Sequence, residues 1–197
     1  MHFYELRQFL WLMKDALLNS NIIRIVDNNR FIELCDKGEI VHNGCTFLDG
    51  FKIALHANMI ALKAPDFIDS NDIIEDEWKP LNLNENILNN GNFYLAVSNE
   101  KICISKRLMG LIQTRSYWAR MGLDCIGSSY YVGPGFGNNN PTSMTLELRP
   151  RVNIKLTTEK AFASLILFEF ANPVQQGSVD HYKRFPLNLN IYNNDKG

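Results

Sequence analysis

Two arginines and a serine form the clearest chemical signal in this sequence. Arg115, Ser116 and Arg120 lie in the segment RSYWARMGL, residues 115–123. The guanidinium of arginine donates a planar fork of hydrogen bonds that matches phosphate oxygens, and a serine hydroxyl adds a further donor. The spacing therefore predicts a polyphosphate site, against the commoner alternative that these polar residues are simply solvated on a surface.

A glycine-rich segment, GPGFG at 133–137, follows the run SSYYV at 128–132. It does not match a nucleotide-binding P-loop, because Pro134 has no amide N–H and no Lys-Ser or Lys-Thr follows. We interpret the segment as a hairpin. Glycine there lets the backbone approach a flat ligand and present N–H and C=O groups to a base edge.

Glu147 is the third candidate, in a predicted strand over 144–149. Strict alternation places it on the face opposite to Leu146 and Leu148. An ordinary solvent-facing glutamate is the default interpretation. Only the neighbouring motifs make it a candidate catalytic carboxylate.

Composition excludes several function classes. The 197 residues include 20 Lys+Arg and 21 Asp+Glu, for a net charge of −1 and a pI near 6.4, so no global positive field exists to hold nucleic acid or an anionic membrane. Four cysteines without CxxC spacing and four histidines without ligand spacing exclude a zinc deaminase, and they predict reduced core thiols in a cytoplasmic protein. Charged residues within 2–18 argue against a signal peptide or membrane span there.

The elements that must position these residues are mostly short strands. One amphipathic helix is expected near the N-terminus, from the stripe Leu6, Leu10, Met13 and Leu17. Residues 107–115 could form a short helix or a bent strand, and the acidic segment 65–80 is expected to be a surface excursion without a function. Many short strands with little helix favour a β-barrel or sandwich. Strands are expected at 22–25, 31–34, 51–55, 93–97, 102–104, 144–149, 151–156 and 162–170.

Taken in order, these motifs resemble the dCTP deaminase family of the dUTPase-like superfamily. The family pattern R-S-S-x-A-R-x-G-L matches 115–123, its hairpin I-D-P-G-[WF] matches 132–136, and its strand ending L-E-[FL] matches 146–148. The spacing is ungapped from about Asn86 to Phe136. Two departures are Gly133 in place of the hairpin Asp, and Tyr117 in place of the second Ser.

The resemblance implies a mainly β subunit, a distorted jelly-roll or β-barrel with an N-terminal helix. It implies one domain over 1–197, with the helix over 1–20 and a C-terminal lid or tail over 178–197. It also implies a homotrimer whose active sites lie at subunit interfaces.

The implied reaction is the zinc-independent hydrolytic deamination of dCTP, or a closely related cytosine deoxynucleotide, to dUTP and ammonia. Glu147 would be the general base, and Ser116 and Arg120 would fix the attacking water and the glutamate. Mg²⁺ would arrive with the triphosphate. The remaining nucleotide contacts implied by the resemblance are Arg115, Ser129, Tyr131, Gly133, Phe136 and, in the lid, Tyr182 and Lys183.

Two alternatives stay open beside the deaminase. One is a dUTPase or a bifunctional enzyme that also releases pyrophosphate. The other is a non-catalytic nucleotide-binding regulatory protein that has lost sugar recognition through Gly133. In each case the expected partners are a small nucleotide and further copies of this chain, not nucleic acid or a membrane.

Overall fold

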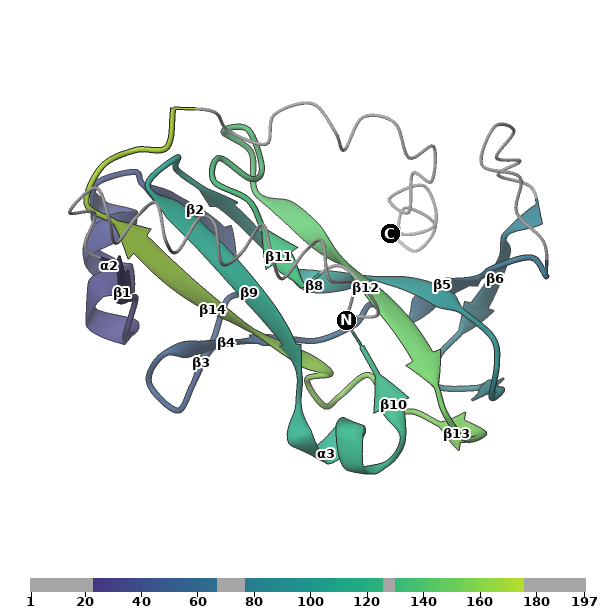
Figure 1. Ribbon diagram of the computed structural model, residues 1–197. Helices are drawn as coiled ribbons and strands as arrows, with labels where there is room; N and C mark the ends of the chain where they lie inside the picture. Colours follow the sequence, from purple (N-terminus) through teal and green to yellow (C-terminus); the bar gives the residue numbers. More distant parts are fainter. Residues whose placement is uncertain (1–22, 67–76, 126–129, 176–197) are drawn as a thin grey trace.

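The computed structural model describes residues 23–66, 77–125 and 130–175 as antiparallel sheets that enclose an apolar core (Figure 1). One six-stranded sheet has the order β11-β9-β14-β4-β3, and β1 also pairs with β14. Its strands are β1 (Ile23–Ile25), β3 (Phe47–Leu48), β4 (Lys52–Leu55), β9 (Leu108–Thr114), β11 (Tyr131–Val132) and β14 (Ala163–Phe170). The mainly β class expected from the sequence is confirmed.

The second six-stranded sheet has the order β10-β12-β8-β5-β6, with β2 also paired to β8. Its strands are β2 (Ile40–Asn43), β5 (Ile60–Lys63), β6 (Lys79–Asn82), β8 (Tyr94–Ile104), β10 (Leu123–Asp124) and β12 (Thr142–Pro150). A separate two-stranded pair consists of β7 (Ile87–Leu88) and β13 (Ile154–Lys155). The described helices are α2 (Asn28–Asp36) and α3 (Ser116–Arg120).

The main core lies between the inner faces of the two sheets. Leu146 and Leu148 of β12 and Leu165 and Leu167 of β14 are at most 2% exposed and belong to one cluster. Their two-residue spacing is the strand alternation that places every second side chain on the buried face. The alternation therefore also fixes which side chains of β12 point away from the core.

The prediction of a strand at 31–34 is wrong, because these residues lie within α2. Asp27 ends the preceding turn in an extended conformation, and its side chain accepts a hydrogen bond from the Arg30 N–H at 2.8 Å, which caps the helix. Phe31 and Leu34 are then buried on one side, as the helical spacing of three residues allows.

Other strand boundaries also differ from expectation. The runs at 93–97 and 102–104 are parts of one long strand, β8, and only Ile154–Lys155 of the expected strand 151–156 is a strand. Residues 107–115 resolve as a strand, β9, rather than a helix. The expected N-terminal helix, the C-terminal lid and most of the acidic excursion lie outside the described residues. None of the helices described in the structure is long and apolar enough to cross a membrane.

Candidate functional site

The short helix α3 carries three of the predicted site residues. Arg115 is the residue at which β9 becomes α3: its N–H donates to the Phe162 carbonyl at 3.0 Å, and its own carbonyl accepts from the Ala119 N–H at 3.0 Å. Ser116 and Arg120 are exposed, while Arg115 is half-buried. Positions four apart on a helix are neighbours, so the hydroxyl of Ser116 and the guanidinium of Arg120 are on the same side of α3.

Trp118 anchors this helix to the rest of the protein. Its indole is 2% exposed, its Nε1–H donates to the Ala161 carbonyl at 3.0 Å, and its ring packs on Phe162 with centroids 4.8 Å apart. The adjacent Tyr117 is 47% exposed, with Lys160 Nζ 4.4 Å from its ring centroid. One buried ring thus fixes the position of the exposed polar residues on either side of it in the chain.

The segment that follows α3 connects it to the strand of Glu147. Gly122, with a φ of +83°, closes the helix, and its carbonyl accepts the Arg151 N–H at 2.7 Å. β10 then pairs with the end of β12, with Leu123 opposite Pro150. Glu147 lies three residues before Pro150, roughly 10 Å along the strand. The structure therefore links α3 through β10 to the end of β12, the strand that carries Glu147 (Figure 1).

Glu147 itself is half-buried, on the face of β12 that points away from the main core. In the register it is opposite Leu95, and cross-strand partners share a face. Leu95 belongs to a buried cluster with Leu62 and Trp78 on this outer face. The interpretation of Glu147 as an ordinary solvent-facing glutamate is thus only partly correct, because its carboxylate lies at the edge of an apolar surface.

Sequence reasoning missed the residues of this outer face. Arg149, two residues after Glu147 on β12, holds its guanidinium carbon 5.1 Å from the ring centroid of Phe93, which also packs on Trp78. A signal was present, since the uninterrupted apolar run FYLAV (93–97) is typical of a strand buried on both faces. Its pairing with the strand of Glu147 could not be read from the run.

The glycine-rich turn lies at the other end of the sheets. Tyr131 is opposite Leu111 of β9, and the Phe136 carbonyl accepts the Ile104 N–H at 3.0 Å. Ile104 is at the last position of β8, nine residues beyond Leu95, the partner of Glu147. The register shift between β8 and β12 takes up two of these residues, which leaves about seven strand positions, or roughly 20–25 Å. Within one chain, Gly133 and Phe136 are therefore not brought together with Glu147.

Glu100, part of the family-like segment, has a different environment. The residue is 4% exposed, and its carboxylate accepts from the backbone N–H of His56 at 2.8 Å and lies 2.7 Å from His56 Nδ1. The neighbouring Ser98 hydroxyl donates to the Glu100 carbonyl and accepts the Met144 N–H where the β8–β12 register shifts. The Ser98 hydroxyl therefore satisfies backbone groups at the register shift, and the Glu100 carboxylate is paired with His56.

The four cysteines are free thiols. Burial raises the pKa of Cys45 to about 12, and it also raises the pKa of Cys125. Neither is an activated nucleophile near neutral pH. Among the described residues, no three His, Cys, Asp or Glu side chains are placed to share a metal ion. Ser129, Tyr182 and Lys183 lie outside the described part of the chain.

Comparison with known families decides the relationship of the chain. The dCTP deaminase-like family matches residues 20–170. The chain belongs to this family. A curated dCTP deaminase from Buchnera aphidicola subsp. Baizongia pistaciae (strain Bp) is 33% identical over 84 residues, which are 40% of this chain and 44% of that protein.

Two solved structures are also similar to this chain. The crystal structure of 2'-deoxycytidine 5'-triphosphate deaminase from Agrobacterium tumefaciens matches with a TM-score of 0.51 at 11% identity, over 75% of this chain and 48% of that one. The native dUTPase of EIAV gives a TM-score of 0.43 at 14% identity, over 70% of this chain and 93% of that one. The match to the Agrobacterium tumefaciens structure covers less than half of that protein's length, and it establishes the fold class alone.

Proposed function

We propose that the protein catalyses the hydrolytic deamination of dCTP, or of a closely related cytosine deoxynucleotide, to dUTP and ammonia. The observation that carries the proposal is the placement of Glu147: half-buried beside the apolar Leu95 cluster, on the strand whose end is joined to the α3 segment. Family membership supports the reaction class. The enzyme is then a hydrolase that uses a carboxylate base.

Glu147 is assigned the proton transfers. Its carboxylate takes one proton from the water whose oxygen bonds to C4 of cytosine, and it gives that proton to the C4 amino group. The C4–N bond then breaks and ammonia leaves, while the second water proton ends on N3 of the uracil product. Water thus supplies the new C4 oxygen, and the glutamate returns to its starting state. General acid–base transfer of this kind contributes about 10²- to 10⁴-fold to a rate.

Arg115, Ser116 and Arg120 are assigned to the phosphates and to the orientation of the water and Glu147. Guanidinium groups bind phosphate oxygens through paired, charge-assisted hydrogen bonds. Mg²⁺ enters as part of the substrate, bound to the triphosphate, and neutralises part of its charge. The roles of Ser129, Tyr182 and Lys183 in nucleotide binding remain expectations from the family resemblance.

A second copy of the chain is needed to complete the site if Gly133 and Phe136 also contact the nucleotide, since roughly 20–25 Å separates their turn from Glu147 in one chain. A homotrimer with sites between subunits satisfies this requirement. Light scattering should then give about three times 22.6 kDa. Co-expressing Arg115→Met with Phe136→Ala should restore part of the activity that each variant loses alone.

The experiment that identifies the reaction is to incubate the purified protein with dCTP and Mg²⁺ and to separate the products. Ammonia with dUTP supports the deaminase, and ammonia with dUMP and pyrophosphate indicates the bifunctional alternative. Nucleotide binding without either product supports a regulatory protein, for which the absence of the family Asp at Gly133 is the specific observation. No binding of dCTP at all would overturn the proposal.

A further inference from the structure

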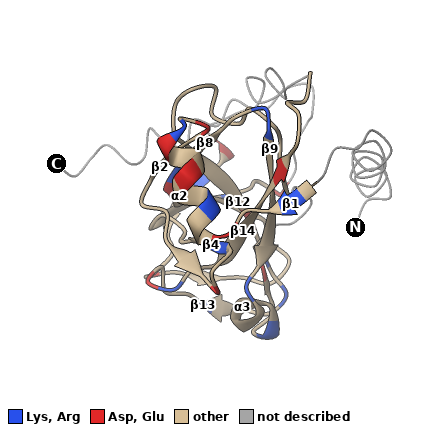
Figure 2. Cartoon of the chain, turned by 90° about the vertical axis from the view of Figure 1, so that its left-hand side faces the viewer, with Lys and Arg blue, Asp and Glu red and all other residues tan. Residues whose placement is uncertain are grey.

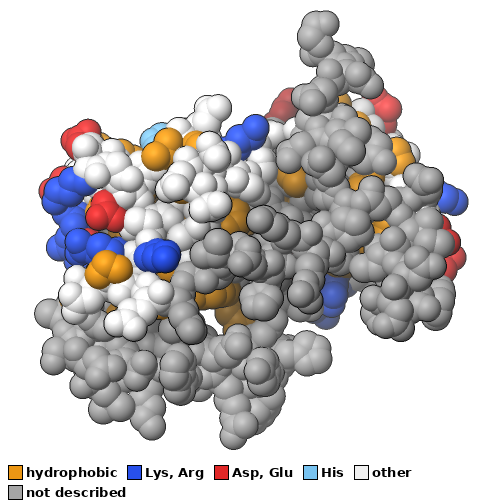
Figure 3. Space-filling model, turned by 90° about the horizontal axis from the view of Figure 1, so that it is seen from above, with side chains coloured by type: hydrophobic (Ala, Val, Ile, Leu, Met, Phe, Trp, Pro, Cys, Tyr) orange, Lys and Arg blue, Asp and Glu red, His pale blue; other side chains and the backbone are white. Residues whose placement is uncertain are grey.

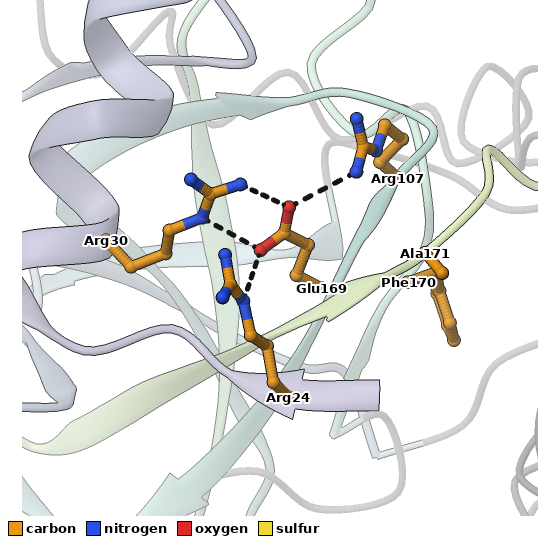
Figure 4. Close-up of a pocket in the computed structure, with 6 residues that line it drawn as sticks. All are labelled: Arg24, Arg30, Arg107, Glu169, Phe170 and Ala171. Atoms are coloured by element: carbon orange, nitrogen blue, oxygen red, sulfur yellow. Dashed lines mark hydrogen bonds and ion pairs between the residues drawn. The ribbon is translucent and has the colours of Figure 1, made fainter. Parts of the chain in front are cut away.

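Three arginines surround one buried carboxylate at the end of the molecule that carries α2 and β1 (Figures 2 and 4). Arg24 of β1, Arg30 of α2 and Arg107 of the turn before β9 all contact Glu169 of β14, whose side chain is 5% exposed. We call these four residues the arginine cluster. They come from four separate elements, so the fold itself must assemble them.

The hydrogen bonds within the cluster are unevenly shared. Arg30 donates from Nε and Nη2 to the two oxygens of Glu169, at 2.9 and 2.6 Å, and also pairs with the exposed Glu33. Arg24 donates to Glu169 through Nε alone, at 2.8 Å. Arg107 reaches the carboxylate through one nitrogen, at 3.4 Å. Two of the three guanidiniums therefore use only part of their donor capacity on Glu169.

Arg107 also carries an unsatisfied donor. Its Nε is buried and has no hydrogen-bond partner within the described residues. A buried donor without a partner is costly and uncommon in folded proteins. Because Arg107 lines a cavity, an acceptor bound in the cavity could pair with this atom.

The cluster lines a cavity of about 230 Å³, together with Phe170 and Ala171 (Figure 4). A water molecule occupies about 30 Å³ in the liquid, so the cavity has room for a tetrahedral oxyanion. Glu33 also pairs with Arg30, so three guanidiniums against two carboxylates leave one positive charge around the cavity. At this end of the surface, Lys and Arg side chains lie together with some Asp and Glu side chains (Figure 3).

We propose that this cavity is a binding site for a phosphate group. Glu169 holds the guanidiniums in place, and the donors of Arg24 and Arg107 that do not contact Glu169, including the buried Nε, bind the phosphate oxygens. The excess positive charge favours an anion, and a phosphate group offers more acceptor oxygens than a carboxylate to the donors of two arginines. The planar donor fork of arginine suits phosphate oxygens.

This site is distinct from the proposed nucleotide site. The two share no residue, and β9 separates them along the chain: Arg107 precedes its first residue and Arg115 follows its last. The phosphate group could belong to inorganic phosphate, pyrophosphate or a nucleotide, because all three present the same chemistry. The inference does not depend on the proposed reaction.

The test is calorimetric titration of the full chain with inorganic phosphate at low ionic strength. Arg107→Met and Arg24→Met should each raise the dissociation constant at least tenfold, and Arg107→Lys should raise it less than Arg107→Met. Lys101→Met, which removes an exposed charge on β8, should change it less than twofold. Arg115→Met should also leave it within twofold.

Folding can be checked separately in the same variants. Because Glu169 keeps Arg24 and Arg30 when Arg107 is replaced, Arg107→Met should retain the wild-type melting temperature without phosphate to within a few degrees. Absence of phosphate and pyrophosphate binding in the wild type would overturn the inference. So would loss of binding in Arg115→Met but not in Arg107→Met, or acetate binding as tightly as phosphate.

Pyrophosphate and a nucleoside triphosphate serve as further titrants and identify the carrier. A nucleotide should also bind at the α3 site, so its titration is made in the Arg115→Met background. Tighter binding of pyrophosphate or the nucleotide than of phosphate, again lost in Arg107→Met, would identify a larger ligand of the same site. Equal affinity for all three would identify the single phosphate group as the recognised unit.

Discussion

Replacing Trp118 with Phe tests whether one buried ring fixes the helix that carries Arg115, Ser116 and Arg120. The substitution removes the 3.0 Å hydrogen bond from Nε1 to the Ala161 carbonyl and shrinks a ring that is 2% exposed. A buried acceptor left without its donor costs about 1–3 kcal/mol. The space left by the smaller ring adds roughly 1 kcal/mol.

We therefore expect Trp118→Phe to lower the free energy of unfolding by about 2–4 kcal/mol. For a chain of this size each kcal/mol lowers the melting temperature by roughly 2–4 °C. Urea denaturation followed by circular dichroism measures the loss, with an unchanged slope showing that the unfolded state is the same. Affinity for dCTP should fall as well, because α3 loses its anchor.

The neighbouring aromatic residue provides a matched control. Tyr117→Phe changes a side chain that is 47% exposed and accepts only a 3.3 Å hydrogen bond from Lys160 Nζ. Its stability should stay within about 0.5 kcal/mol of the wild type. If Trp118→Phe were no more destabilising than Tyr117→Phe, the anchoring role of the buried ring would be refuted.

Three further predictions concern stability. Arg30, followed by Arg24, lowers the pKa of Glu169 from its ordinary value of 4.5 to about 2. The stabilisation of the fold by the ionised Glu169 is therefore present above pH 4.5 and is lost as the pH falls towards 2. Calorimetric melting should show this loss of stability in acid for the wild type and not for Glu169→Gln. Gly137→Ala should lower the free energy of unfolding in urea by about 1–3 kcal/mol or more, because at a φ of +90° its Cβ would meet the Asn140 carbonyl at 2.7 Å. Gly91→Ala, at a φ of +83° with open space around it, should cost only about 1 kcal/mol. Equal losses in the two variants would contradict the steric argument. Asp27→Ala should lower the melting temperature through loss of about 1 kcal/mol of helix capping, and an unchanged value would show that the cap is not needed.

The parts of the fold that the sequence predicts well are those set by local patterns. The alternation in 144–149 gave the inward Leu146 and Leu148 of β12, and both are buried. By contrast, 31–34 resembles a strand because three of its four residues are apolar and one of them, Ile32, is β-branched, yet Asp27 caps a helix there. Capping by a side chain three residues before Arg30 outweighed the weak strand preference of so short a run.

The candidate site also has a part that local sequence predicts and a part that depends on long-range pairing. Arg115, Ser116 and Arg120 are close in sequence, so one short helix is enough to bring them together. The surroundings of Glu147 depend on a register that places Leu95 opposite it, and the distance to the Gly133 turn depends on which end of β8 that turn packs against. Such long-range pairings are set by the tertiary packing and leave no local signature in the chain.

Ammonia release from dCTP by Glu147→Gln is the most direct test of the proposed chemistry. The exposed Glu85→Gln variant is the control for loss of one carboxylate. We expect Glu147→Gln to reduce turnover at least 100-fold while dCTP affinity changes only a few-fold, and Glu85→Gln to retain wild-type turnover. Turnover within twofold of the wild type in a folded Glu147→Gln protein would contradict the assignment of the general base.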